Sequence, residues 1–206
     1  MKNSLKNILI CLILLMVMKM KVTLGVSNRH VHLTEETYKK IFGDKPLNPV
    51  KYLVQPGQFA SDKFVTIKNG NRKIEKVRVL GPFRKYNQVE ISKTDSYTLK
   101  LNPPVRNSGD IKGSSPITLV SEETEINLKE GCIIANRHIH MTKEEAEKYG
   151  FIGKEKVKIK IEGEKSGILN DVYLRIAENS SFELHLDTDD GNAFGLKTGD
   201  KIEIIK

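Results

Sequence analysis

The sequence contains no tryptophan, few aromatic side chains and only two cysteines. Cys11 and Cys132 form no Cys-x-x-Cys pair, so the chain has neither a disulfide framework nor a cysteine zinc site. A reducing compartment, the cytoplasm, is the natural inference. The apolar run at residues 8–18 is shorter than the roughly 20 residues that a transmembrane helix needs. Any bound metal must therefore be held by histidine and carboxylate side chains.

Residues 1–20 stand apart from the rest of the chain. Their apolar run is flanked by lysines, as in a secretory signal, but no small-residue cleavage site follows it. Three interpretations stay open: a leader, an apolar docking or targeting helix, and translated sequence upstream of a true start at Met18 or Met20.

The formal net charge of +8 suggests anionic partners, such as nucleic acid or phosphate-bearing small molecules. Most of this charge comes from scattered lysines, and the chain lacks both a concentrated basic stretch and a nucleic-acid signature. We therefore expect no nucleic-acid partner. The length of 206 residues suits one large domain or two smaller ones.

One short motif occurs twice and contains four of the five histidines: Asn-Arg-His-Val-His-Leu-Thr at residues 28–34 and Asn-Arg-His-Ile-His-Met-Thr at residues 136–142. Residues two apart in a strand point to the same face. Each His-x-His pair therefore directs two imidazoles to one point, while Val31 or Ile139 turns back towards a core. Neutral imidazole is the commonest protein ligand for zinc.

Each motif leads directly into a capped helix, which supports a structural duplication. Thr34 is a good N-cap for a helix at residues 35–42, and Thr142 with Glu145 forms a capping box for a helix at residues 143–149. Strands are predicted at residues 22–33, 63–68, 74–80, 88–92, 117–120, 132–135, 156–161, 168–176, 182–187 and 201–205. Short strands with glycine-rich turns, occurring twice, indicate two tightly packed barrels or sandwiches.

Two further side chains complete a set of candidate metal ligands. Glu90 lies on the opposite face from Val89 and Ile91, and His185 shares its face with two carboxylates. The six candidates are His30, His32, Glu90, His138, His140 and His185. Reactive zinc typically has three protein ligands and one open position, so six ligands divide into two sites. Arginine binds phosphate bidentately, and the arginines near these ligands are Arg29, Arg84 and Arg137.

Several ordered motifs together resemble the phosphate propanoyltransferase family, a zinc-dependent phosphotransacylase of the propanediol-utilisation type. The resemblance spans roughly residues 22–206, and its motifs lie at residues 26–33, 55–60, 77–82, 88–92, 105–110 and 136–142. It implies a mainly β fold of two closely packed β-barrels with short capping α-helices and an internal duplication. It also implies that residues 21–28 plus 136–206 form one barrel and residues 29–135 the other, with residues 1–20 as a leader or targeting segment.

The resemblance also implies roles for individual residues. One zinc would be bound by His30, His32 and Glu90, and a second by His138, His140 and His185, giving two Zn²⁺ per chain. Arg84 would be the catalytic, phosphate-binding arginine. The expected coenzyme A contacts are Val26, Ser27, Asn28, Arg78 and Asn192. Implied partners are acyl-CoA and phosphate, a second copy in a homodimer, and shell or lumen proteins of a bacterial microcompartment.

The implied reaction is the reversible transfer of a short acyl group, propanoyl or acetyl, between coenzyme A and phosphate. Direct attack by phosphate is preferred, because neither Ser27 nor Cys132 has the partners of a nucleophile. A two-metal hydrolase, in which hydroxide attacks instead of phosphate, is the main alternative. A non-enzymatic basic zinc protein that binds nucleic acid is the second.

Overall fold

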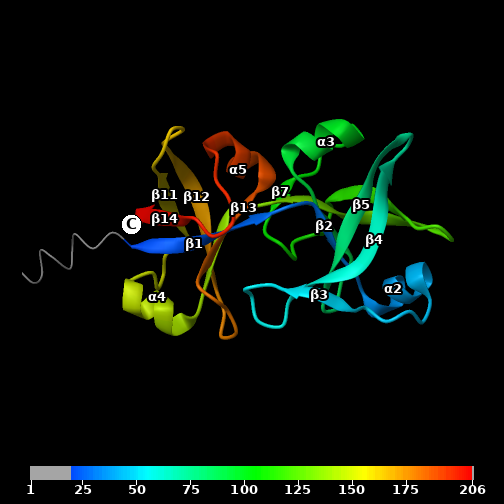
Figure 1. The fold of residues 1–206 in the computed structure, drawn as a ribbon, viewed down its shortest axis with the longest axis horizontal. Helices are drawn as coiled ribbons and strands as arrows, with labels where there is room; N and C mark the ends of the chain where they lie inside the picture. The colour runs from blue at the N-terminus through cyan, green and yellow to red at the C-terminus, as the bar shows by residue number, and fades with distance from the viewer. Residues whose placement is uncertain (1–19, 206) are drawn as a thin grey trace, which may run out of the picture.

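The computed structural model describes residues 20–205 as two β-barrels packed side by side (Figure 1). Strands predominate, and four short helices lie at the edges of the barrels in this part of the chain. The prediction of a mainly β, duplicated, two-barrel fold is confirmed. No helix among residues 20–205 is long and apolar enough to cross a membrane. The leader predicted at residues 1–20 lies, apart from Met20, outside the described residues.

The first barrel is closed by six strands in the order β1-β13-β10-β12-β11-β14. Their bounds are β1 (Lys21–Ser27), β10 (His138–Met141), β11 (Lys156–Ile161), β12 (Gly167–Ile176), β13 (Glu183–Asp187) and β14 (Lys201–Ile205). Leu24, Ile139 and Leu184 are completely buried in its core. Because Ile139 faces the core, the histidines on either side of it face away from the barrel, as the alternation of a strand requires.

The second barrel also closes with six strands, in the order β4-β5-β2-β6-β9-β8, because β8 pairs with both β4 and β9. Their bounds are β2 (His30–His32), β4 (Phe59–Asn69), β5 (Arg72–Gly81), β6 (Gln88–Glu90), β8 (Ser115–Val120) and β9 (Glu125–Ala135). Two short strands extend it, β3 (Pro49–Tyr52) beside β4 and β7 (Val105–Arg106) beside β9. Val31 is completely buried in its core.

The two barrels repeat one topology: β9, β6, β2, β5, β4 and β8 correspond to β1, β13, β10, β12, β11 and β14. The chain crosses between the barrels just before each His-x-His pair, from β1 to β2 and from β9 to β10. The prediction of one strand at residues 22–33 is therefore wrong. That segment is two strands of different barrels, because β1 pairs with β13 and β14 whereas β2 pairs with β5 and β6.

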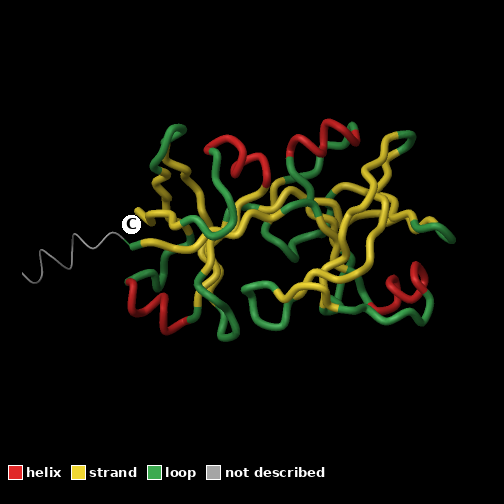
Figure 2. Tube along the Cα trace, in the orientation of Figure 1, coloured by secondary structure: helices red, strands yellow, loops and turns green. Residues whose placement is uncertain are grey.

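Both predicted helices are present, as α2 (Glu35–Phe42) and α4 (Lys143–Tyr149). The hydroxyl of Thr34 accepts a hydrogen bond from the backbone of Thr37, and Thr142 with Glu145 forms the expected capping box. Two further helices, α3 (Lys93–Leu99) and α5 (Thr188–Phe194), follow β6 and β13. Figures 1 and 2 show them next to each other above the junction of the barrels. They touch there, since the backbone N–H of Thr94 donates to Asp189 at 2.8 Å.

Candidate metal centre between the barrels

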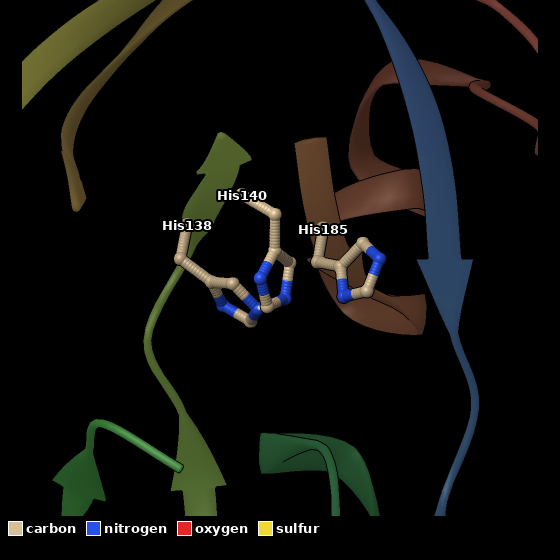
Figure 3. A group of neighbouring side chains, drawn as sticks. All are labelled: His138, His140 and His185. Carbon is tan, nitrogen blue, oxygen red and sulfur yellow. Dashed lines mark hydrogen bonds between the residues drawn. The ribbon is translucent and has the colours of Figure 1, made fainter. Parts of the chain in front are cut away.

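Three histidines of the first barrel converge on one point (Figure 3). His138 and His140 come from β10, and His185 comes from β13, where it lies directly opposite His138 in the antiparallel pairing. The ring centroids of the three side chains are 4.8 to 5.0 Å apart. The facing Nε2 atoms of His138 and His140 are 3.2 Å apart.

The second barrel holds the equivalent group of His30, His32 and Glu90. Glu90 lies opposite His30 in the pairing of β2 with β6, as His185 lies opposite His138. All three side chains are buried, and the Nε2 atom of His30 lies 3.5 Å from an oxygen of Glu90. Both groups contribute to the walls of one small cavity between the barrels, which His30, Glu90, His138 and His185 line together.

Three histidines of these groups, His32, His138 and His140, are held in the neutral form because their pKa values are lowered. Burial, helped by the neighbouring His185 and His140, lowers the pKa of His138 well below its usual value of 6.5. Burial, His185 and Arg175 lower the pKa of His140 to about 3. Burial, His30 and Arg84 lower the pKa of His32 well below 6.5. A neutral imidazole offers a lone pair, which a metal ion requires.

Both groups fit a zinc ion. His30 and His138 each direct Nδ1 to a backbone oxygen two residues earlier, Asn28 at 2.8 Å and Asn136 at 2.7 Å. Their Nε2 atoms therefore carry the free lone pairs. Two ligands of a tetrahedral zinc are about 3.3 Å apart, given bonds of about 2.0 Å. The 3.2 Å between Nε2 of His138 and Nε2 of His140 matches this spacing. His32 also has a buried Nδ1 that finds no hydrogen-bond partner among the described residues.

Two arginines direct positive charge at the same region. The Nε atom of Arg84 is buried and makes no hydrogen bond to any residue between 20 and 205. The charge of Arg84 acts on His32 and on His140 of the other barrel. Arg175 lies beside His140 in the parallel pairing of β10 with β12, so the two side chains share a face. Burial lowers the pKa of Arg175 below its ordinary value; the carboxylate of Glu90 opposes this shift, and the positive charge of Arg84 adds to it.

Arg29 and Arg137, which the sequence also offered as anion ligands, have carboxylate partners instead. Arg29 forms a two-pronged ion pair with Asp95 of α3, at 2.9 and 2.7 Å. Arg137 forms the same pair with Asp190 of α5, at 2.6 and 2.8 Å. These duplicated pairs fix each helix to the crossing segment ahead of a His-x-His pair. The interpretation of these two arginines as anion ligands is therefore not supported by their contacts.

The residues expected to contact coenzyme A fall into two regions. Val26, Ser27 and Asn28 lie at the end of β1, and Ser27 and Asn28 line the cavity. Asn192 is exposed on α5, whose Gly191 lies against Val26 closely enough that an added Cβ would be 3.3 Å from it. Arg78 lies beside His30 in the parallel pairing of β5 with β2, but its guanidinium contacts other groups: it donates to the carbonyl of Ser61 at 2.5 Å and covers the ring of Phe64 at 4.3 Å. These five positions remain predictions for ligand binding.

The fold and the site define a class of protein: a pair of duplicated β-barrels with two histidine-rich groups, suited to divalent metal ions, at their junction. A family profile described as phosphate propanoyltransferase matches residues 23–197. The chain belongs to the phosphate propanoyltransferase family, a family of acyltransferase enzymes.

Several curated relatives carry the same description. The phosphate propanoyltransferase of Thermotoga maritima is 46% identical over 187 residues, which cover 90% of this chain and 89% of that protein. The one from Shewanella putrefaciens is 46% identical over 182 residues, 88% of this chain and 86% of that protein. The one from Salmonella typhimurium is 42% identical over 175 residues, 84% and 83% of the two chains.

Proposed function

We propose that this protein transfers a short acyl group reversibly between coenzyme A and inorganic phosphate: acyl-CoA + phosphate = acyl phosphate + CoA. The relatives' name supports propanoyl as the acyl group, and acetyl is the next candidate. The observation that carries the proposal is the small cavity between the barrels. It is lined by members of both metal-suited groups, and the charge of Arg84, whose Nε has no hydrogen-bond partner among the described residues, acts on His32 and His140 of these groups.

Two zinc ions would be held by His30, His32 and Glu90 and by His138, His140 and His185. When bound, they would supply Lewis-acid polarisation to the thioester carbonyl and the phosphate oxygens. The protein supplies rigid ligands on strands of both barrels, so the geometry does not have to be assembled during the reaction.

Arg84 and Arg175 would bind the phosphate. Among the described residues, no carboxylate forms a salt bridge or hydrogen bond with either guanidinium, in contrast to Arg29 and Arg137. A guanidinium that is partly buried without a partner gains strongly from an anion, because charge-assisted bonds replace its lost hydration. The arginines would hold the phosphate oxygens and offset their negative charge while the phosphate attacks the carbonyl carbon. The bond to sulfur then breaks, and coenzyme A leaves as its thiolate.

No protein nucleophile is needed in this scheme. Cys132 is completely buried, and burial together with the charge of Asp95 raises the pKa of its thiol to about 12. It is therefore not a thiolate at neutral pH. Val26, Ser27, Asn28 and Asn192 would hold coenzyme A beside the cavity, with Arg78 as a further contact. A homodimer, microcompartment partners and the division of the chain at residues 28/29 and 135/136 stay predictions.

The proposal is tested by thiol release from propanoyl-CoA and acetyl-CoA, with and without phosphate, while hydroxylamine traps any acyl phosphate. Phosphate-dependent thiol release with formation of hydroxamate is expected. Thiol release without phosphate, yielding the free acid, would instead show a two-metal hydrolase. The ratio of kcat/KM for the two acyl-CoAs measures the preferred chain.

A further inference from the structure

The duplication includes one further residue in each barrel, in addition to the candidate metal ligands. Across from the second histidine of each pair, His32 lies opposite Gln88 and His140 opposite Glu183. Gln88 and Glu183 are therefore equivalent positions. Each precedes the third candidate ligand of its group by two residues, so it shares a face with Glu90 or His185.

In the second barrel, Gln88 holds Glu90. Its amide nitrogen donates to Oε1 of Glu90 at 2.6 Å and to the hydroxyl of Ser108 at 2.8 Å. Its own oxygen accepts from the backbone N–H of Gly109 at 2.7 Å, which fixes the orientation of the amide. Gln88 is completely buried. Glu90 is thereby left with Oε2 facing His30.

In the first barrel, Glu183 holds His185. Oε2 of Glu183 lies 2.8 Å from Nε2 of His185 and accepts from the amide of Gln55 at 3.0 Å. Gln55 comes from the other barrel, and both atoms of its amide are held by the backbone of Ser181, at 3.2 and 3.0 Å. A carboxylate accepts only, so the proton of His185 lies on Nε2 and its lone pair on Nδ1. His138, whose Nδ1 faces a backbone carbonyl, has the opposite arrangement.

A glycine makes room for this pair. Gly25 of β1 lies beside His185 in the parallel pairing with β13. A Cβ at Gly25 would be 2.8 Å from Oε1 of Glu183 and 3.3 Å from the ring of His185. Any larger residue at position 25 would therefore push Glu183 or His185 out of place.

We propose that Gln88 and Glu183 are equivalent positioning residues that select the ligand atom of each metal site: Oε2 of Glu90 and Nδ1 of His185. The inference rests on the proposed function, because it assumes that both groups bind metal. It also explains why Gln88 stands behind a carboxylate ligand and Glu183 behind an imidazole ligand. A carboxylate ligand needs a hydrogen-bond donor behind it, whereas an imidazole ligand needs an acceptor. Each site, counted with its positioning residue, then contains one carboxylate and has the same net charge.

The direct test is nitrogen-15 NMR of the imidazoles in the zinc-loaded full chain, with His185 assigned from the signals that disappear in His185→Gln. The expected result is a metal-bound Nδ1 and a protonated Nε2 for His185, opposite to His30 and His138. A metal-bound Nε2 for His185 would overturn the inference and leave the proposed function standing. A chain that binds no metal would contradict the metal sites themselves.

Two variants test the positioning role by metal affinity. Gln88→Met removes the donor to Glu90, and Glu183→Gln replaces the carboxylate with a weaker acceptor that must serve both His185 and Gln55. In chelator competition with zinc, each variant should weaken one of the two sites by about 10- to 100-fold and leave the other unchanged. The exposed Glu164→Gln is the matched control and should change neither site. If both affinities stay at parent values while only Tm falls, the two residues have a purely structural role and the inference is wrong.

Discussion

Removal of the Arg84 side chain is the sharpest single perturbation of the proposed reaction. Its buried Nε has no hydrogen-bond partner in the part of the chain that the structure describes, so Arg84→Ala breaks no hydrogen bond from this atom there, and the fold should persist. What is lost is a charge-assisted, two-pronged contact to phosphate, worth about 2–4 kcal/mol in the transition state. At about 1.4 kcal/mol per factor of ten, the rate should fall by roughly 30- to 1000-fold.

The assay is the initial rate of thiol release as a function of phosphate concentration, with zinc content measured on the same samples. Arg84→Lys should recover little activity, since a point charge does not reproduce the planar fork of a guanidinium. Arg72→Ala, at an exposed position of β5, is the matched control and should retain the parent rate. If Arg84→Ala keeps its rate within a few-fold of the parent, the phosphate-binding role assigned to Arg84 is wrong.

Three further outcomes follow from the site. Arg175→Met should raise the KM for phosphate at least tenfold while zinc content stays constant, and an unchanged KM would remove Arg175 from the anion site. Cys132→Ala should keep its activity. In a Cys11→Ser background, the thiol of Cys132 should resist a disulfide reagent at pH 8, and rapid labelling would contradict its pKa of about 12. In chelator-treated protein, the unfolded chain protonates His140 below about pH 6.5, but the folded chain does so only near pH 3. Stability should therefore fall as the pH drops from 6.5 towards 3, with a weaker dependence in His140→Gln, as Tm measurements would show.

Local signals in the sequence were sufficient for the two helices that follow the His-x-His pairs. Thr34 and Thr142 cap α2 and α4 as predicted, because capping depends on side chains within three residues of the helix start. Helix α3 was not predicted from the sequence, although Ser92 and Asp95 form a capping box. Its residues are mostly β-branched, aromatic or short polar ones, which have low helix propensity, and its ion pair with Arg29 is a long-range contact.

Long-range pairing explains what the sequence could not show. The alternation at residues 22–33 is continuous, and only the pairing partners divide it between two barrels. Strand alternation places Arg175 on one face of β12, but only the pairing with β10 shows that this face includes His140. The sequence places Glu183 two residues before His185, on the same face of a strand. Its hydrogen bond with Gln55 could not be predicted, because it joins residues of different barrels. The candidate ligands were found because a repeated His-x-His pair is a local pattern.

The number of zinc ions required for phosphate-dependent acyl transfer tests the central claim most directly. The protein is stripped with a chelator, zinc is added back in steps, and bound zinc and the rate of thiol release are measured at each step. The rate should reach its maximum at two zinc ions per chain and disappear when His32 and His140 are both replaced by alanine. Full phosphate-dependent activity in protein that binds no stoichiometric metal would contradict the account.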